Sequence, residues 1–165
     1  MSSRRGSLNL PRIGQGFDIH PFSDDPARRL ILGGVAIDGP GLVGHSDADV
    51  VAHAVADALL GAAGEGDLGT MFPASEQAWA DADSMVLLAR VMGAKITPAW
   101  EVGNVDITII AEAPRLAPHV AAMADRVGQV VGADVSVKPK RAETLGALGR
   151  GEGIACLALT VLGRR

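Results

Sequence analysis

The chain has 165 residues, of which 48% are hydrophobic and 21% charged, a composition that predicts one folded domain and excludes wholesale disorder. Its 19 acidic and 15 basic residues give a net charge of -4, and only 3% of the residues are aromatic. These values exclude the basic surface that binds a nucleic-acid backbone and the aromatic platform that stacks single-stranded bases. Because no apolar stretch reaches membrane-spanning length, we expect no membrane partner either.

We expect residues 1–11 to form a flexible N-terminal tail and residues 12–165 to form a single domain, because the first residues carry no apolar core pattern. Cys156 is the only cysteine, so no disulfide can form within the chain. A reducing compartment, and therefore the cytoplasm, is the natural interpretation. The thiol lies in an apolar run, where a buried and unreactive cysteine is expected.

The first predicted strand covers residues 12–20, which alternate loosely in polarity and end before a proline. Side chains two residues apart share one face of a strand, so Asp18 and His20 project together. This pair offers one carboxylate oxygen and one imidazole nitrogen, which suit zinc or a similar divalent ion. A second strand is predicted over residues 30–37, where it can pair with the first, and residues 38–44 are expected to form a turn.

The stretch from His45 to His53 is the most informative in the chain and is typical of the start of a helix. We expect the helix over residues 48–60, with Ser46 or Asp47 capping its N-terminus. Amide groups at a helix N-terminus favour anions, so His45 and Ser46 are candidates for binding a phosphate. The alternative is that Ser46 only caps the helix.

Three polar residues are spaced four apart on this predicted helix: Asp49, His53 and Asp57. An imidazole between two carboxylates either ligates a metal or belongs to a solvent-exposed charged row. Together with Asp18 and His20, His53 would complete a site of three protein ligands with one open position. That is the arrangement a catalytic zinc requires.

The rest of the chain is predicted to alternate between helices and strands. The expected elements are a glycine-rich irregular loop at 64–73, a helix at 84–93, a strand at 102–111, a loop at 112–118, a helix at 119–131, a strand at 135–138, a loop at 139–149 and a strand at 154–162. This order predicts an α+β fold, with a single two-layer domain in which a mixed β-sheet has helices on one face.

Basic residues gather near the C-terminal end of this acidic chain, at Lys138, Lys140, Arg141 and Arg150. The glycines around Arg150 can form a nest of amide groups that binds an anion. A phosphorylated small molecule would explain this local charge, and so would a network of ion pairs at a subunit interface.

Several motifs stand in an order typical of one family: Gly16-Phe-Asp-Ile-His20, His45-Ser-Asp-Ala-Asp49, Asp57-Ala-Leu-Leu-Gly-Ala62, Gly66-Asp-Leu-Gly69, Ala82-Asp-Ser84, Gly103-Asn-Val-Asp106, Ala113-Pro-Arg-Leu-Ala-Pro-His119 and Gly149-Arg-Gly-Glu-Gly-Ile154. Over about residues 12–162 the chain resembles the 2-C-methyl-D-erythritol 2,4-cyclodiphosphate synthases. The resemblance implies a homotrimer with active sites between subunits. It also implies conversion of 4-diphosphocytidyl-2-C-methyl-D-erythritol 2-phosphate into the cyclic diphosphate and CMP, in non-mevalonate isoprenoid biosynthesis.

The resemblance also implies roles for individual residues. It assigns Asp18, His20 and His53 as ligands of Zn²⁺ or another divalent metal, and Glu143 as a ligand of Mg²⁺ or Mn²⁺ between the substrate phosphates. His45 and Arg141 are the expected catalytic residues. The residues implied to bind substrate are Asp18, His20, His45, Ser46, Asp67, Gly69, Ala111, Pro114, Leu116, Ala117, Lys140, Arg141, Glu143 and Arg150. Arg150 and Glu152 match residues near the trimer axis.

The sequence departs from the family pattern at three positions. Arg141 stands where a threonine usually contacts phosphate, Ala142 replaces a small polar residue, and Ala147 replaces an aromatic residue of the central trimer cavity. Two alternatives therefore stay open: a zinc-dependent phosphohydrolase, and a trimer that binds metal without catalysis.

Overall fold

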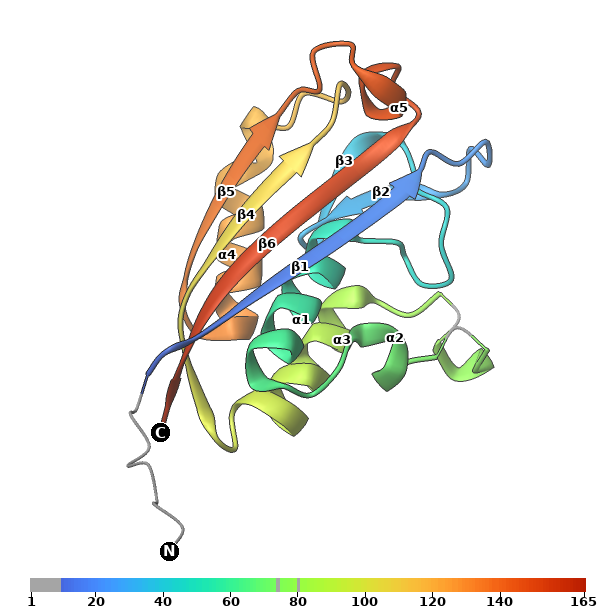
Figure 1. The fold of residues 1–165 in the computed structure, drawn as a ribbon. Coiled ribbons are helices and arrows are strands. Elements are labelled where there is room, and N and C mark those ends of the chain that lie inside the picture. Colours follow the sequence, from blue (N-terminus) through green and yellow to red (C-terminus); the bar gives the residue numbers. More distant parts are fainter. Residues whose placement is uncertain (1–9, 74, 80) are drawn as a thin grey trace, which may run out of the picture.

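A computed structural model describes residues 10–73, 75–79 and 81–165 of the chain, so most of the expected N-terminal tail lies outside the described residues. The described part forms two layers, a four-stranded sheet and a layer of helices against one of its faces (Figure 1). Across the sheet the strands are β1 (Arg12–Pro21), β6 (Gly153–Arg164), β4 (Trp100–Ile110) and β5 (Asp134–Lys140).

The sheet is mixed, as predicted. The β1–β6 and β6–β4 pairs are antiparallel, whereas β4 and β5 are parallel. The connection from β4 to β5 runs through α4 (Val120–Val131), because a parallel pair needs a crossover. The other helices of the layer are α1 (Val50–Ala63) and α3 (Ser84–Val91), which continues into a π-helical turn, η2 (Met92–Ile96). The α+β prediction is therefore confirmed.

The predicted second strand over 30–37 is wrong. The segment is a hairpin of β2 (Arg29–Leu32) and β3 (Val35–Pro40), which form their own two-stranded sheet and do not pair with β1. Gly33 and Gly34 separate the two strands with φ values of 56° and 70°. Two successive residues with positive φ make the tight turn that suits a hairpin, so the apolar run folds back on itself.

The start of α1 also differs from the prediction. Asp49, and not Ser46 or Asp47, caps the helix by accepting hydrogen bonds from the amides of Val51 and Ala52. Asp49 is fully buried and so does not belong to an exposed polar row. Its carboxylate also accepts the amides of the β2–β3 turn at 2.8 and 2.7 Å. Burial raises the pKa of Asp49 to about 6, against the opposing effect of these backbone hydrogen bonds.

Helix α1 lies directly on strand β1. A Cβ atom added to Gly14 would be 1.9 Å from the carbonyl oxygen of Ala58, and one added to Gly16 would be 1.9 Å from that of Ala54. Because no side chain separates the two backbones there, β1 and α1 approach closely. The two glycines thus set how closely β1 approaches α1.

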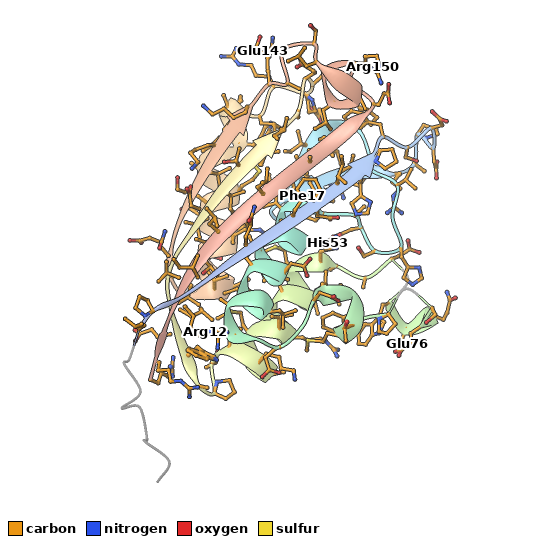
Figure 2. The ribbon with its side chains drawn as sticks, in the orientation of Figure 1. Arg12, Phe17, His53, Glu76, Glu143 and Arg150 are labelled. Atoms are coloured by element: carbon orange, nitrogen blue, oxygen red, sulfur yellow. The ribbon has the colours of Figure 1, made fainter. Side chains whose placement is uncertain are left out.

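The face of the sheet opposite the helices is uncovered in the described part of the chain (Figure 1). Because side chains alternate along a strand, the residues of β1 on either side of Gly14 and Gly16 point to this open face. The large apolar side chains exposed there are Ile13 (72%), Phe17 (53%), Ile19 (48%) and Leu159 (46%). Figure 2 labels Phe17 on β1. The open face is therefore apolar along β1 and β6.

Short helices lie in segments that were expected to be irregular and in one segment, 77–79, for which no element was predicted. They are α2 (Leu68–Met71), η1 (Gln77–Trp79), η3 (Ala117–His119) and α5 (Gly146–Gly149). The loop prediction for 64–73 is thus wrong over α2, which Asp67 caps by accepting the amide of Thr70 at 2.7 Å. In the ranges that the structure describes, no helix has both the length and the apolar character needed to cross a bilayer.

Candidate active site

The predicted metal ligands come together between β1 and α1. Asp18 Oδ2 lies 2.9 Å from His53 Nδ1 and 3.2 Å from His20 Nε2. One ligand atom from each of the three residues lies within 4.8 Å of the others. Asp18 and His20 share a face of the strand, and the close packing of α1 on β1 brings His53 against them from the helix.

The charges of this cluster depend on one another. Burial alone would raise the pKa of Asp18, but hydrogen bonds from His20 and His53 outweigh it and hold that pKa well below its usual value. The hydrogen bond to Asp18 in turn raises the pKa of His20, against the effect of burial. The carboxylate therefore stays ionised and stabilises positive charge beside it, whether a proton or a metal ion.

This donor set fits a catalytic zinc or a similar divalent cation. One carboxylate oxygen and two imidazole nitrogens supply three ligands of the types that zinc prefers, and a fourth position is left for a substrate atom. Asp18 Oδ2 and His53 Nδ1 are 2.9 Å apart. Because an ionised carboxylate and an unprotonated ring nitrogen are both acceptors, a proton or a cation has to lie between them. The geometry therefore agrees with a metal centre.

Zinc binding to this cluster is expected to weaken as the pH falls. Each imidazole nitrogen that binds the metal must be free of a proton, and the raised pKa of His20 extends the competition between proton and metal to higher pH. Asp18 does not compete, since its pKa is lowered. Titration of Zn²⁺ against a chelating dye between about pH 8 and pH 5 measures the effect. An affinity independent of pH over this range would contradict ligation by the two histidines.

Behind the cluster, two serine side chains contact the other ring nitrogen of His53, and an aspartate contacts one of them. Its Nε2 lies 2.9 Å from Ser84 Oγ and 3.1 Å from Ser46 Oγ, and the Ser84 hydroxyl donates to Asp47 Oδ1. Sequence reasoning assigned no role to Ser84, and it considered Asp47 only as a helix cap. Ser84 lies 31 positions after His53, so only the Ala82-Asp-Ser84 motif marked it, without indicating a function.

Arg28 holds the loop that leads into α1. Its guanidinium donates to the carbonyl oxygens of Leu42, Gly44 and Ser46, the second at 3.0 Å. His45 is exposed in this loop, with its Nε2 atom 3.3 Å from the carbonyl oxygen of Glu76. Ser46 is 7% exposed and turns inward, towards His53. Arg28 is therefore a further residue of the site region that the sequence did not reveal.

A second part of the predicted site is a cavity of about 350 Å³ beside β4 and β5. All six predicted substrate-binding residues of this region line it: Ala111, Pro114, Leu116, Ala117, Lys140 and Arg141. Glu112, Arg115 and Pro139 complete the wall. The cavity thus joins a small apolar surface to several charged groups, as small-molecule sites do.

The remaining basic residues are divided between two roles. Lys138 pairs with Asp106 at 2.6 Å, and Arg150 pairs with Glu152 at 2.6 Å, so these two are engaged in ion pairs within the chain. Lys140 and Arg141 instead line the cavity. Lys138 and Arg150 are therefore engaged within the chain, whereas Lys140 and Arg141 face the cavity.

Within one chain, Glu143 and Arg150 lie apart from the candidate metal ligands. Figure 2 shows Glu143 and Arg150 together at the top of the molecule, apart from His53. Asp67 is fully exposed, and the hydrogen bond from the Thr70 amide lowers its pKa. Gly69 is exposed in α2. The predicted site is therefore split into two regions of the chain.

Comparison with known proteins identifies the family. The YgbB family model matches residues 11–163. A Marinobacter nauticus protein named 2-C-methyl-D-erythritol 2,4-cyclodiphosphate synthase is 51% identical over 155 residues, which cover 92% of this chain and 96% of that protein. The chain belongs to the cyclodiphosphate synthase family. A synthase of the same name from Halalkalibacterium halodurans is 50% identical and covers 92% of this chain and 98% of its own length. Members of this family are lyases.

Solved structures of cyclodiphosphate synthases share the fold. The Plasmodium falciparum IspF protein in its CDP complex has a TM-score of 0.82 and 34% identity, and the match covers 96% of this chain and 99% of that one. The bifunctional IspDF protein of Campylobacter jejuni has a TM-score of 0.87 and 36% identity over 94% of this chain. The chain spans 43% of the length of that bifunctional protein.

Proposed function

We propose that this chain catalyses the reaction for which its relatives are named. It converts 4-diphosphocytidyl-2-C-methyl-D-erythritol 2-phosphate into 2-C-methyl-D-erythritol 2,4-cyclodiphosphate and CMP, in the cytoplasm, as a step of non-mevalonate isoprenoid precursor biosynthesis. The observation that carries the proposal is the cluster of Asp18, His20 and His53, whose ligand atoms lie within 4.8 Å of one another. Zinc-type ligands with an open position suit a reaction at a phosphorus atom.

The reaction is a displacement within one molecule. An oxygen of the 2-phosphate attacks the β-phosphorus, the bond from that phosphorus to the bridging oxygen breaks, and CMP leaves with the electron pair. No protein nucleophile is required, and Cys156 does not offer one, since burial raises the pKa of its thiol. The enzyme has to fold the substrate so that the two phosphates meet, and well-oriented intramolecular reactions reach effective molarities of about 10⁵ M or more.

The cavity beside β4 and β5 suits the cytidine end of the substrate. Pro114 and Leu116 offer an apolar surface, and Lys140 and Arg141 offer positive charge at its edge. In this proposal Arg141 neutralises phosphate charge where the family usually places a hydroxyl group, and His45 contacts a phosphate from the loop before α1. Asp67 and Gly69 bind the erythritol portion.

Two divalent ions complete the proposed site. Zn²⁺ or a related ion is held by Asp18, His20 and His53, and Mg²⁺ or Mn²⁺ is held by Glu143 with the substrate phosphates. When bound, these ions neutralise phosphate charge and polarise the bonds at phosphorus. The chain's own part is to hold the ligands at fixed positions and to keep Asp18 ionised.

We propose a homotrimer with active sites between subunits. The open sheet face supports this assembly, because exposed apolar residues such as Ile13 and Phe17 gain by burial against another subunit. The separation of Glu143 from His53 within one chain supports sites shared between subunits, since the two parts then meet only across an interface (Figure 2). Arg150 and Glu152 would lie near the symmetry axis.

Phosphorus NMR of the protein with substrate, Zn²⁺ and Mg²⁺ tests the proposed reaction. Formation of the cyclic diphosphate together with CMP is expected. This result would show that the reaction tolerates Arg141 in place of the family's usual threonine. The competing candidate is a zinc-dependent phosphohydrolase. It is worth testing because Arg141 replaces the threonine that usually contacts phosphate in the family. Release of inorganic phosphate without a cyclic product would favour the hydrolase and contradict the proposal. An unchanged spectrum from the metal-loaded protein would instead indicate the non-catalytic alternative.

A further inference from the structure

We propose that Ser84 and Asp47 are positioning residues that orient the His53 imidazole so that Nδ1 is presented to the metal. The proposal rests on the metal site of the proposed function and adds to it the groups that hold one ligand. The contacts form a chain from Asp47 through the Ser84 hydroxyl to His53 Nε2, on the side of the ring that faces away from Asp18.

Asp47 determines the direction of the hydrogen bonds that link it to Ser84 and His53, because an ionised carboxylate can only accept. Asp47 Oδ1 accepts the Ser84 hydroxyl proton, and Asp47 Oδ2 accepts the Ser84 amide at 3.1 Å. The amide of Asp49 also donates to Asp47 Oδ1, at 3.2 Å. A hydroxyl has a single proton, and that of Ser84 is already used. At 2.9 Å from His53 Nε2, Ser84 Oγ can therefore only accept, so the proton must lie on Nε2.

A neutral imidazole carries one proton and one free lone pair. In a neutral ring with its proton on Nε2, the lone pair of His53 lies on Nδ1, which is 2.9 Å from Asp18 Oδ2, so a metal ion or a second proton has to lie between these two atoms. This is the form that a metal ligand requires. Groups that hold the far nitrogen of a metal-bound histidine commonly fix both its tautomer and its ring orientation, and their loss weakens metal binding by about 10- to 100-fold.

The hydrogen bonds from Asp47 through Ser84 to His53 are well protected from water and connect separate elements. Ser84 is 1% exposed and Ser46 is 7% exposed, so few solvent molecules can compete for His53 Nε2. Ser84 is the first residue of α3, whereas Asp47 belongs to the loop before α1. The Asp47 amide donates to the carbonyl oxygen of Ala82 at 3.1 Å, which holds that loop against the start of α3. The arrangement therefore fixes the direction of the ring from two elements.

The test compares Ser84→Ala and Asp47→Asn with the unmodified protein. Ser84→Ala removes the acceptor of the Nε2 proton. Asp47→Asn replaces one acceptor oxygen by an NH₂ group, which cannot accept the hydrogen bonds that the hydroxyl and amide of Ser84 and the amide of Asp49 now donate to the carboxylate. Asp83→Asn is the matched control, because Asp83 caps α3 through the amide of Met85 and makes no contact with His53 among the described residues. This substitution removes a nearby negative charge and leaves the hydrogen bonds between Asp47, Ser84 and His53 in place.

Two measurements are needed, the affinity for Zn²⁺ alone and the tautomer of His53 in the metal-free protein by ¹H–¹⁵N NMR of the ring nitrogens. We expect about a 10- to 100-fold weaker affinity in Ser84→Ala and Asp47→Asn, with loss of the Nε2–H form, and wild-type values in Asp83→Asn. Thermal unfolding of the metal-free variants separates this effect from misfolding. If Ser84→Ala does not fold, Asp47→Asn serves by itself.

The outcomes that would refute the metal site differ from those that would refute only the positioning role. Unmodified protein that binds no Zn²⁺ would refute the metal site and with it this inference. Zn²⁺ binding in the unmodified protein, with equal affinity and an unchanged Nε2–H signal in both folded variants, would refute the positioning role alone. Equal weakening in all three variants would also refute it, because an effect that does not depend on contact with His53 would then explain the result.

Discussion

Replacing His53 with alanine is expected to reduce turnover by at least about 10³-fold while the protein stays folded. The metal is expected to supply several kcal/mol of charge stabilisation, and every 1.4 kcal/mol corresponds to about tenfold in rate. The cluster of Asp18, His20 and His53 lies at the edge of the core between β1 and α1, and its ligands are partly exposed. Metal loss should therefore remove activity without unfolding the chain, as at a catalytic and not a structural site.

The measurements are turnover by phosphorus NMR, Zn²⁺ content after dialysis, and thermal unfolding. His119→Ala is the matched control, because His119 precedes α4 and makes no side-chain capping bond. The control should keep both zinc and activity. An unfolded His53→Ala protein would contradict the assignment, and so would a folded one that retains turnover.

The same variant tests whether active sites are shared between subunits. His53→Ala and Glu143→Ala should each be inactive alone. After the two proteins are mixed under conditions of subunit exchange, an intact site forms wherever one subunit supplies His53 and its neighbour supplies Glu143. Random assembly in a ring would restore about a quarter of the wild-type activity. No recovery after demonstrated exchange would contradict sites formed between subunits.

Replacing Gly16 with alanine is expected to destabilise the protein by at least about 3 kcal/mol, the upper end of typical overpacking costs. The added methyl group would lie 1.9 Å from the carbonyl oxygen of Ala54, which is backbone and cannot rotate away. Helix α1 would have to move off β1, and His53 would move away from Asp18. We therefore expect weaker Zn²⁺ binding as well as a lower midpoint of urea unfolding.

Gly61→Ala is the control for this change. Gly61 lies within α1, and a Cβ atom there would meet nothing closer than the carbonyl oxygen of Gln15 at 3.9 Å. The substitution should stabilise the helix by about 0.5 to 1 kcal/mol, because alanine forms helix better than glycine. Gly16→Ala protein with unchanged stability would refute the account of how α1 and β1 are held together.

The sequence by itself was sufficient to predict the candidate metal ligands and most of the elements around them. The spacing of Asp18 and His20 required one strand face, and the pattern around His53 required a helix, so local periodicity was sufficient to propose the cluster. The six residues of the cavity beside β4 and β5 were also foreseen, through the resemblance to a known family. Their grouping is confirmed, whereas their roles stay predictions.

The tertiary structure alone decided which groups support the ligands. Asp49 matched an exposed polar row, but folding buries it beneath the β2–β3 turn, whose amides it accepts. Ser84 meets His53 from another helix, and no local pattern relates positions 31 apart. Periodicity reports which face of an element a residue occupies. It does not report what packs against that face, because this depends on how distant elements bury their apolar surfaces together.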